Sequence, residues 1–217
     1  MKHVRKGAPP DSFLAWKAKA NEDWSPTYDN LQNPEKMDLH KSLLAEQGEV
    51  CCYCGRRVGL LDSHIEHFRP QECRLDLELD YSNLYASCLR EVAREQPLHC
   101  GHAKKSQFDE ANYISPQEED CEQRFIYAAD GQQLSAKWDD LAANYMVDIL
   151  NLNAFFLSAR RAAALAGVFD NEFLLNATPD ELRTIRDAYR EVDDAGRLPD
   201  MGHVIARFAE QRLSDLP

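Results

Sequence analysis

The sequence predicts an α+β protein that is mainly helical, with a metal-stapled core between an N-terminal arm with helices and a C-terminal helical region. Metal-capable side chains cluster in the middle of the chain, where six of the seven cysteines and four of the seven histidines fall between residues 51 and 105. Helical spacing of apolar residues dominates after residue 138. We therefore expect three regions, at residues 1–50, 51–115 and 116–217.

Length and composition indicate a protein with a sizeable core and no membrane span. The chain has 217 residues, of which 44% are hydrophobic, and it contains no run of eighteen apolar residues. Its first ten residues start with basic side chains but lack the apolar segment of a secretory signal. We therefore expect a cytoplasmic protein, whose seven cysteines act as metal ligands or free thiols rather than as disulfides.

The formal net charge of −12 restricts how the chain could hold nucleic acid. Neutralisation of phosphates by lysine and arginine supplies most of the non-specific affinity of nucleic-acid-binding proteins. A nucleic-acid role therefore requires a local basic patch, a bound metal or the surface of a partner.

The first region reads as an arm followed by two helices. Two adjacent prolines exclude a helix from residues 1–10, which we expect to be extended. A short helix follows over residues 13–20, with Phe13 and Trp16 on one face. A second helix is expected from the proline at position 34 to a glycine at position 48.

The central region changes to short elements and turns. Cys51 and Cys54 form a C-x-x-C pair followed by Gly55, which is typical of a metal-binding knuckle because the tight turn aims two thiolates at one ion. After it we expect strands at residues 60–69 and 75–81, helix or loop at 82–95, and the start of a helix at 101–109.

The last region reads as a hairpin and then helices. The dipeptide Asp130-Gly131 is a turn signal within residues 122–131, and Thr178-Pro179 is a helix start signal. Helices are expected at residues 138–150, 153–166, 179–192 and 200–213. The residues expected in the core are Ile149, Leu150, Leu152, Phe155, Phe156, Leu157 and Leu165.

Four cysteines are candidate ligands of a structural zinc ion. Cys51 and Cys54 supply one pair, and Cys88 and Cys100 can supply the other, although eleven residues separate them where a compact knuckle has about two. An inserted loop of this length adds only modest closure entropy. The alternative is that these are ordinary buried cysteines that bind no metal.

Four other residues suggest metal-assisted hydrolysis of a phosphodiester. Glu66 is a hard oxygen ligand, His67 can accept a proton near neutral pH, Asn83 can donate and accept hydrogen bonds, and His102 is a nitrogen ligand. Together they supply a ligand pair for a divalent ion, a base for water and a residue to orient that base.

The motifs that contain these residues resemble the HNH, or ββα-metal, nucleases. They are most similar to the PtuB-type HNH subunit of Septu antiviral systems, which also accompanies some retrons. The N-terminal arm and the segment before Arg160-Arg161 are similar as well, although the sharp motifs cover only residues 51–105. The motifs are Cys51-x-x-Cys54, Ile65-Glu66-His67-Phe68-Arg69-Pro70, Tyr81-Ser82-Asn83-Leu84-Tyr85-Ala86-Ser87-Cys88 and Cys100-Gly101-His102-Ala103-Lys104-Lys105.

The resemblance implies roles for these residues. It implies that Glu66 and His102 hold a catalytic Mg²⁺ or Mn²⁺ ion, that His67 activates water, and that Asn83 orients the His67 ring. His64 and His99 are alternatives to His102 as the second ligand of that ion. It also implies that the four cysteines bind structural Zn²⁺ and that residues 51–115 form the nuclease core.

The resemblance also implies a substrate and partners. The substrate would be DNA, and the partner an ABC or SMC-like ATPase of the PtuA type, in some systems with a retron reverse transcriptase and its nucleic acid. The helical region from residue 138 is the expected docking surface. Candidate phosphate contacts, which could equally be ordinary solvated charges, are Arg69, Arg74, Lys104 and Lys105.

Two other functions remain open. A non-catalytic zinc module that binds a protein or nucleic acid would explain the four cysteines equally well, but it has no need of Glu66, His67, Asn83 and His102 in that order. An HNH nuclease that acts on RNA would use the same residues, and the sequence shows no evident aromatic stacking platform for single strands.

Overall fold

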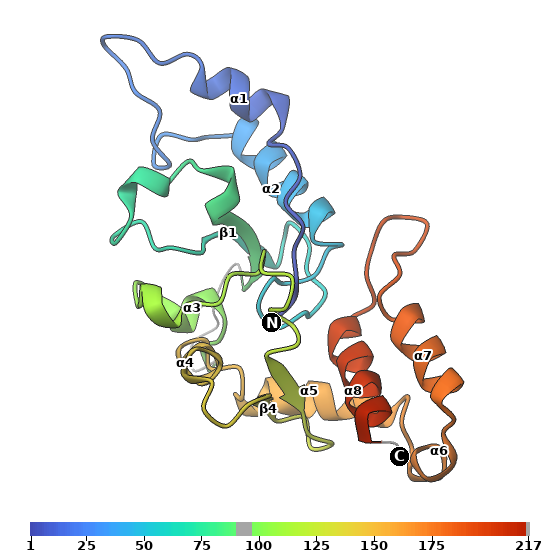
Figure 1. Cartoon of the computed structure of the whole chain (residues 1–217). Coiled ribbons are helices and arrows are strands. Elements are labelled where there is room, and N and C mark those ends of the chain that lie inside the picture. Colours follow the sequence, from blue (N-terminus) through green and yellow to red (C-terminus); the bar gives the residue numbers. More distant parts are fainter. Residues whose placement is uncertain (90–96, 216–217) are drawn as a thin grey trace.

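A computed structural model describes residues 1–89 and 97–215 (Figure 1). In the described chain two short antiparallel hairpins are each accompanied by helices, with α1 and α2 at one end of the molecule and α6, α7 and α8 at the other. The helices are α1 (Asp11–Lys17), α2 (Glu35–Glu46), α3 (Gly101–Lys104), α4 (Leu141–Ile149), α5 (Phe155–Ala166), α6 (Asn171–Asn176), α7 (Pro179–Ala188) and α8 (Gly202–Asp215). The strands are β1 (Ser63–His67), β2 (Leu84–Cys88), β3 (Phe125–Tyr127) and β4 (Gln133–Ser135), and the 3₁₀ turns are η1 (Leu75–Leu77), η2 (Tyr81–Asn83) and η3 (Glu110–Asn112).

The N-terminal segment follows its prediction. The arm is free of helix and hydrogen-bonds the backbone on both sides, from Lys2 to Cys52 and from Val4 to Pro116. Helix α1 begins directly after the prolines, and the rings of Phe13 and Trp16 stack with centroids 6.0 Å apart. Helix α2 buries Leu39, Leu43 and Leu44 on one face.

The hairpin β1–β2 carries the candidate catalytic segment, and it corrects two predictions. Its register pairs Glu66 with Tyr85 and His67 with Leu84. Residues 75–81 alternate in sequence like a strand but form the turn η1 and the approach to η2, because β2 pairs with β1 and no strand lies beside them in the described chain. Part of the segment expected as helix or loop is instead strand β2, and residues 90–95 of that prediction lie outside the described chain.

The second hairpin and the C-terminal helices were largely predicted. Strands β3 and β4 flank the expected turn at Asp130-Gly131, and α4, α5, α7 and α8 lie where helical spacing placed them. Helix α6, whose six residues include no buried side chain, was not predicted.

The core prediction failed at two aromatic residues. Phe155 and Phe156 are 88% and 40% exposed, whereas the other five expected core residues are buried. The buried face of α5 instead comprises Leu157, Arg161 and Leu165, spaced four apart. Arg161 is fully buried because its guanidinium donates to the carbonyls of Gly131 and Leu152 at 2.6 and 2.7 Å. Because the charged residue Arg161 lies at the centre of this buried face, the spacing of apolar residues in the sequence did not reveal it.

Replacing Thr178 with alanine is expected to lower the free energy of unfolding by about 1 kcal/mol. Thr178 and Glu181 form a reciprocal capping box at the start of α7, so the change leaves the backbone N–H of Glu181 without its acceptor. Urea denaturation measures the effect. Thr184→Ala in the same helix is the control, since that hydroxyl bonds the carbonyl of Asp180 and should contribute little. Equal stability of the two variants would contradict the role of the cap.

Candidate active site and metal centre

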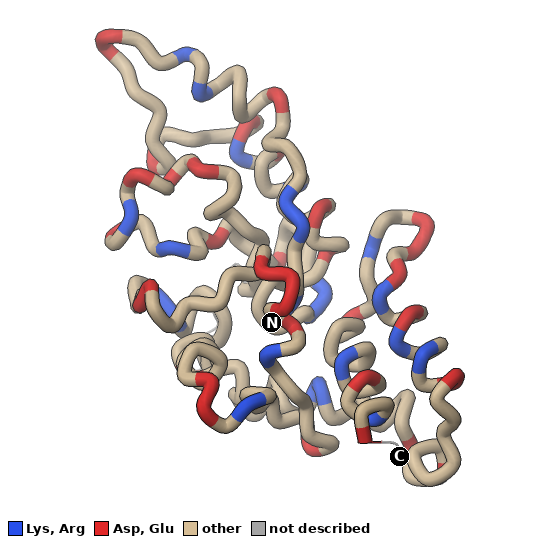
Figure 2. Tube along the Cα trace, in the orientation of Figure 1, with Lys and Arg blue, Asp and Glu red and all other residues tan. Residues whose placement is uncertain are grey.

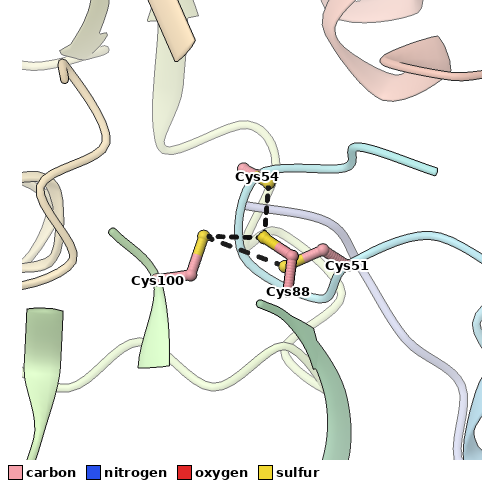
Figure 3. Close-up of side chains that lie close together, drawn as sticks. All are labelled: Cys51, Cys54, Cys88 and Cys100. Atoms are coloured by element: carbon pink, nitrogen blue, oxygen red, sulfur yellow. Dashed lines mark hydrogen bonds between the residues drawn. The ribbon is translucent and has the colours of Figure 1, made fainter. Parts of the chain in front are cut away.

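Four cysteine side chains converge beside the hairpin β1–β2 (Figure 3). Cys51 and Cys54 come from the turn before β1, Cys88 ends β2, and Cys100 directly precedes α3. All four are buried, and their Sγ atoms lie within 4.8 Å of one another, with three separations of 3.6, 3.6 and 3.8 Å. Four sulfurs each 2.3 Å from a central zinc form a tetrahedron with edges of about 3.8 Å. The cluster therefore fits a structural zinc ion.

His99 lies against this cluster rather than among the candidate catalytic residues. Its Nδ1 is 3.2 Å from Sγ of Cys100 and 3.7 Å from Sγ of Cys88. This position suits a hydrogen bond to a metal-bound thiolate, an interaction that orients a ligand without binding the metal. The remaining cysteines lie outside the cluster: Cys52 and Cys121 are buried elsewhere, and Cys73 is exposed.

Glu66 is a buried carboxylate whose two oxygens are both occupied by protein groups. Oε1 lies 2.6 Å from Nζ of Lys104 and accepts from the Tyr53 hydroxyl at 3.1 Å, while Oε2 is 3.1 Å from Nε2 of His64. Burial alone would raise the pKa of Glu66, but the charge of Lys104 and the bond with His64 outweigh it and hold the pKa at about 2. Glu66 is therefore ionised at neutral pH.

Gly101 is needed where α3 meets this carboxylate. A Cβ atom at position 101 would lie 2.2 Å from Oε2 of Glu66. Any side chain at position 101 would therefore have to displace the Glu66 carboxylate, and the glycine found there offers no metal ligand of its own.

His64 and His102 lie together beside Glu66. Their ring centroids are 4.7 Å apart, and both rings donate to the carbonyl of Leu89, from Nδ1 of His64 at 2.5 Å and from Nε2 of His102 at 2.8 Å. Burial would lower the pKa of His64, but its bond and charge interaction with Glu66 raise it overall. Of the three histidines considered as the second ligand, His64 is the one that touches Glu66.

His67 lies on the other face of β1, since side chains alternate along a strand. Its Nε2 donates to the carbonyl of Glu78 at 3.0 Å, and its ring packs edge-on against Tyr28 with centroids 4.4 Å apart. Donation from Nε2 assigns the neutral ring a free lone pair on Nδ1. Burial is the main cause that lowers the pKa of His67. The ring is thus a neutral proton acceptor near pH 7.

Asn83 fixes the loop that follows β1. Its Oδ1 accepts from the backbone N–H of Arg69 at 2.8 Å, and its Nδ2 donates to the carbonyls of Arg69 and Leu77 at 3.0 and 3.3 Å. Among the described residues no hydrogen bond joins Asn83 to His67. Asn83 instead donates to the carbonyl of Leu77, and the next residue, Glu78, supplies the carbonyl that accepts from His67. Any effect of Asn83 on the orientation of the His67 ring is therefore indirect.

The candidate phosphate contacts differ in accessibility. Lys104 is 1% exposed, and besides Glu66 its ammonium donates to the carbonyls of His67 and Phe68 at 2.7 and 3.0 Å, so it does not offer an exposed cation. Arg69 pairs with Glu110 at 3.0 Å, and Arg74 pairs with Asp76 at 2.7 Å. Lys105 is exposed.

Two contacts of Glu66 escaped the sequence analysis, which named Lys104 only as a candidate phosphate contact and did not single out Tyr53. The hydroxyl of Tyr53 and the ammonium of Lys104 reach Glu66 from segments 13 and 38 positions away, and no local pattern signals such contacts. For His64 the signal was present, because residues two apart share a face of a strand.

The side chains around Glu66 have donor atoms that suit a catalytic ion, but they do not form a preformed coordination site. One carboxylate and two imidazoles suit a divalent transition ion such as Mn²⁺. In residues 1–89 and 97–215, however, the four cysteines are the one group of three or more metal-capable side chains whose ligand atoms converge. Binding of an ion by Glu66, His64 and His102 would require the Lys104 ammonium and the Leu89 carbonyl to give way.

Replacing Lys104 with methionine is expected to lower the free energy of unfolding by about 3–5 kcal/mol, because it leaves the buried Glu66 carboxylate without its cation. Adding Glu66→Gln to Lys104→Met should restore part of the loss, since an amide carries no charge to bury. Urea denaturation of the single and double variants measures the coupling, and Lys105→Met, next to it and exposed, is the control. Strictly additive losses would contradict a direct ion pair.

Comparison with known proteins supports a relationship to HNH nucleases. No protein-family model matches the chain. The chain is 27% identical over 139 residues to a protein of Vibrio cholerae serotype O1 biovar El Tor named "Retron Vc95 putative HNH endonuclease". The matched segment covers 61% of this chain and 64% of that protein. The likeness supports a nuclease function, and the buried cysteine cluster could bind zinc. No helix in the described ranges is long and apolar enough to cross a bilayer.

Proposed function

We propose that this protein is a metal-dependent HNH endonuclease that hydrolyses DNA phosphodiester bonds as the effector of an antiviral defence complex. The observation that carries the proposal is His67, a neutral ring held by the Glu78 carbonyl on the hairpin β1–β2. A zinc module that only binds a partner has no need of such a base.

In the proposed reaction His67 accepts a proton from water at Nδ1. The Glu78 carbonyl holds the ring, and Asn83 holds the loop that carries this carbonyl. Glu66, with His64 and His102, would hold a divalent ion, which when bound supplies positive charge for the phosphate and the departing 3′ oxygen. The zinc at Cys51, Cys54, Cys88 and Cys100 would fix the position of α3 against β1.

The test is nicking of supercoiled plasmid DNA by the purified chain with Mg²⁺ or Mn²⁺. We expect nicking that stops when the added ion is withheld while the protein keeps its zinc. Faster cleavage of an RNA of matched length would instead support the RNA alternative. The proposal would be contradicted if neither substrate is cleaved, both by the chain alone and in the presence of an ATPase encoded beside its gene.

An ATPase of the ABC or SMC-like type is the proposed partner, and in a retron system a reverse transcriptase would join it. The chain has a net charge of −12, and its basic positions are interspersed with acidic ones along the trace rather than gathered in one stretch (Figure 2). A partner that grips DNA would supply the missing basic surface.

Docking of this partner is expected on the region from residue 138 onward. Trp138 and Phe155 are 92% and 88% exposed there, and large exposed aromatic side chains are common anchors of interfaces. Trp138→Glu or Phe155→Glu should abolish co-purification with the ATPase, whereas Leu75→Glu, an exposed leucine outside this region, should not. Co-purification that survives both substitutions would place docking elsewhere.

A further inference from the structure

A groove of about 450 Å³ is lined by residues of α2, of the segment that leads into β1 and of β1 itself. Figure 1 shows where these elements lie in the molecule. We propose that it holds a stretch of the DNA strand that the enzyme cleaves, with Lys36 bound to a backbone phosphate. This proposal rests on the nuclease function proposed above and adds where the substrate lies. The residues that carry it are Tyr28, Lys36, Met37, Leu61 and His64.

The charge of the groove suits a polyanion. Its lining contains one lysine and two histidines but no aspartate or glutamate, in a chain that has 37 acidic and 25 basic residues. Lys36 forms no ion pair with any carboxylate of the described residues, whereas Arg69 and Arg74 are both paired. Its ammonium therefore remains available to a phosphate without first breaking a salt bridge.

The groove leads to the candidate base. The Lys36 ammonium lies 4.4 Å from the centre of the Tyr28 ring, and the His67 ring lies 4.4 Å from the same centre. The cation and the base therefore contact the same ring and lie close together. A phosphate on Lys36 would consequently belong to a nucleotide close to the bond that water attacks with His67 as its base.

Apolar side chains form the exposed wall of the groove. Leu61 is 87% exposed and Met37 is 39% exposed, so both offer apolar surface to sugars and base faces. In the described chain β1, three of whose residues line the groove, pairs only with β2 and has no strand partner on its other edge. Apolar contact beside a single unpaired cation suits a nucleic-acid strand better than a small anion, which needs only charge.

Fluorescence anisotropy with labelled DNA oligonucleotides, single-stranded and duplex, tests the groove at low ionic strength. All proteins carry His67→Ala so that the probe stays intact. Leu61→Glu should weaken binding about tenfold by placing a carboxylate against the strand. The control is Leu175→Glu on α6, since Leu175 is equally exposed at 85%. It should bind within about twofold of the parent.

Lys36→Gln tests the phosphate contact itself. It should reduce the slope of log affinity against log salt concentration by about 0.7 to 0.9, the value for one lost phosphate contact. Lys41→Gln, an exposed lysine on the same helix, should leave the slope unchanged. Equal effects of the two lysine variants would overturn the proposal that this groove binds DNA, and so would equal effects of the two leucine variants. So would absence of binding at low salt, yet plasmid nicking would then still stand as evidence for the nuclease.

Discussion

Replacing His67 with alanine is expected to lower the rate of plasmid nicking by about 100- to 10,000-fold, the usual contribution of a general base. Zinc content and thermal unfolding should hardly change, because the ring is only half-buried and makes one side-chain hydrogen bond, to the Glu78 carbonyl. Nicking under single-turnover conditions measures the effect. Unchanged cleavage by the variant would remove His67 from the mechanism.

Two controls separate catalysis from structure at this position. His3→Ala removes a histidine from the N-terminal arm and should leave nicking intact. Added imidazole should partly restore nicking by His67→Ala, since a free base can occupy the vacated space, whereas a merely misfolded variant would not respond. The pH profile gives a third readout. Because the pKa of His67 is lowered from 6.5, the neutral base persists at pH 6.5, and the rate should fall only in more acidic solution.

Replacing Cys100 with serine is expected to release the zinc and unfold most of the chain. Structural zinc in small domains contributes roughly 10–16 kcal/mol of apparent binding free energy at pH 7, which is comparable to the whole stability of a domain. Cys100 also directly precedes α3, so its loss frees the helix that places Gly101 and Lys104 against Glu66. Elemental analysis and circular dichroism would show less than one zinc per chain and a lost thermal transition.

Cys73→Ser is the matched control. Cys73 is exposed and lies outside the cluster, so its replacement should change neither zinc content nor unfolding temperature. A Cys100→Ser variant that retains one zinc and the parental unfolding temperature would show that the cluster holds no structural ion.

Local signals in the sequence predicted a good part of this fold. The C-x-x-C turn, the hairpin turn at Asp130-Gly131 and the capping box at Thr178 each depend on residues within a few positions of one another. Such features can be recognised in short stretches of sequence because their physical causes, namely turn geometry and helix capping, are themselves local.

The predictions that failed depend on contacts across the chain. Strand β2 could not be told from a helix because all five of its side chains are buried, which removes the alternation of a half-exposed strand. Lys104 looked like a surface cation until α3 placed it on Glu66. Arg161 broke the apolar stripe of α5 because its partners are backbone carbonyls, which no side-chain pattern reveals.

The segment at residues 198–201 is hydrogen-bonded directly to the turn that carries Cys51 and Cys54 and to the residues beside it. Met201 donates its backbone N–H to the carbonyl of Gly55, the N–H of Arg57 donates to Asp200, and Leu198 donates to Gly48. A protein that docks on the C-terminal helices and shifts residues 198–201 would therefore also shift the turn that carries Cys51 and Cys54. If docking of a partner changes the affinity for zinc, zinc changes the affinity for that partner by the same factor, because coupling between two binding events is reciprocal. The affinity for zinc would then change on assembly, and the metal could serve as a spectroscopic reporter, through cobalt substitution, of whether this chain has bound the proposed partner.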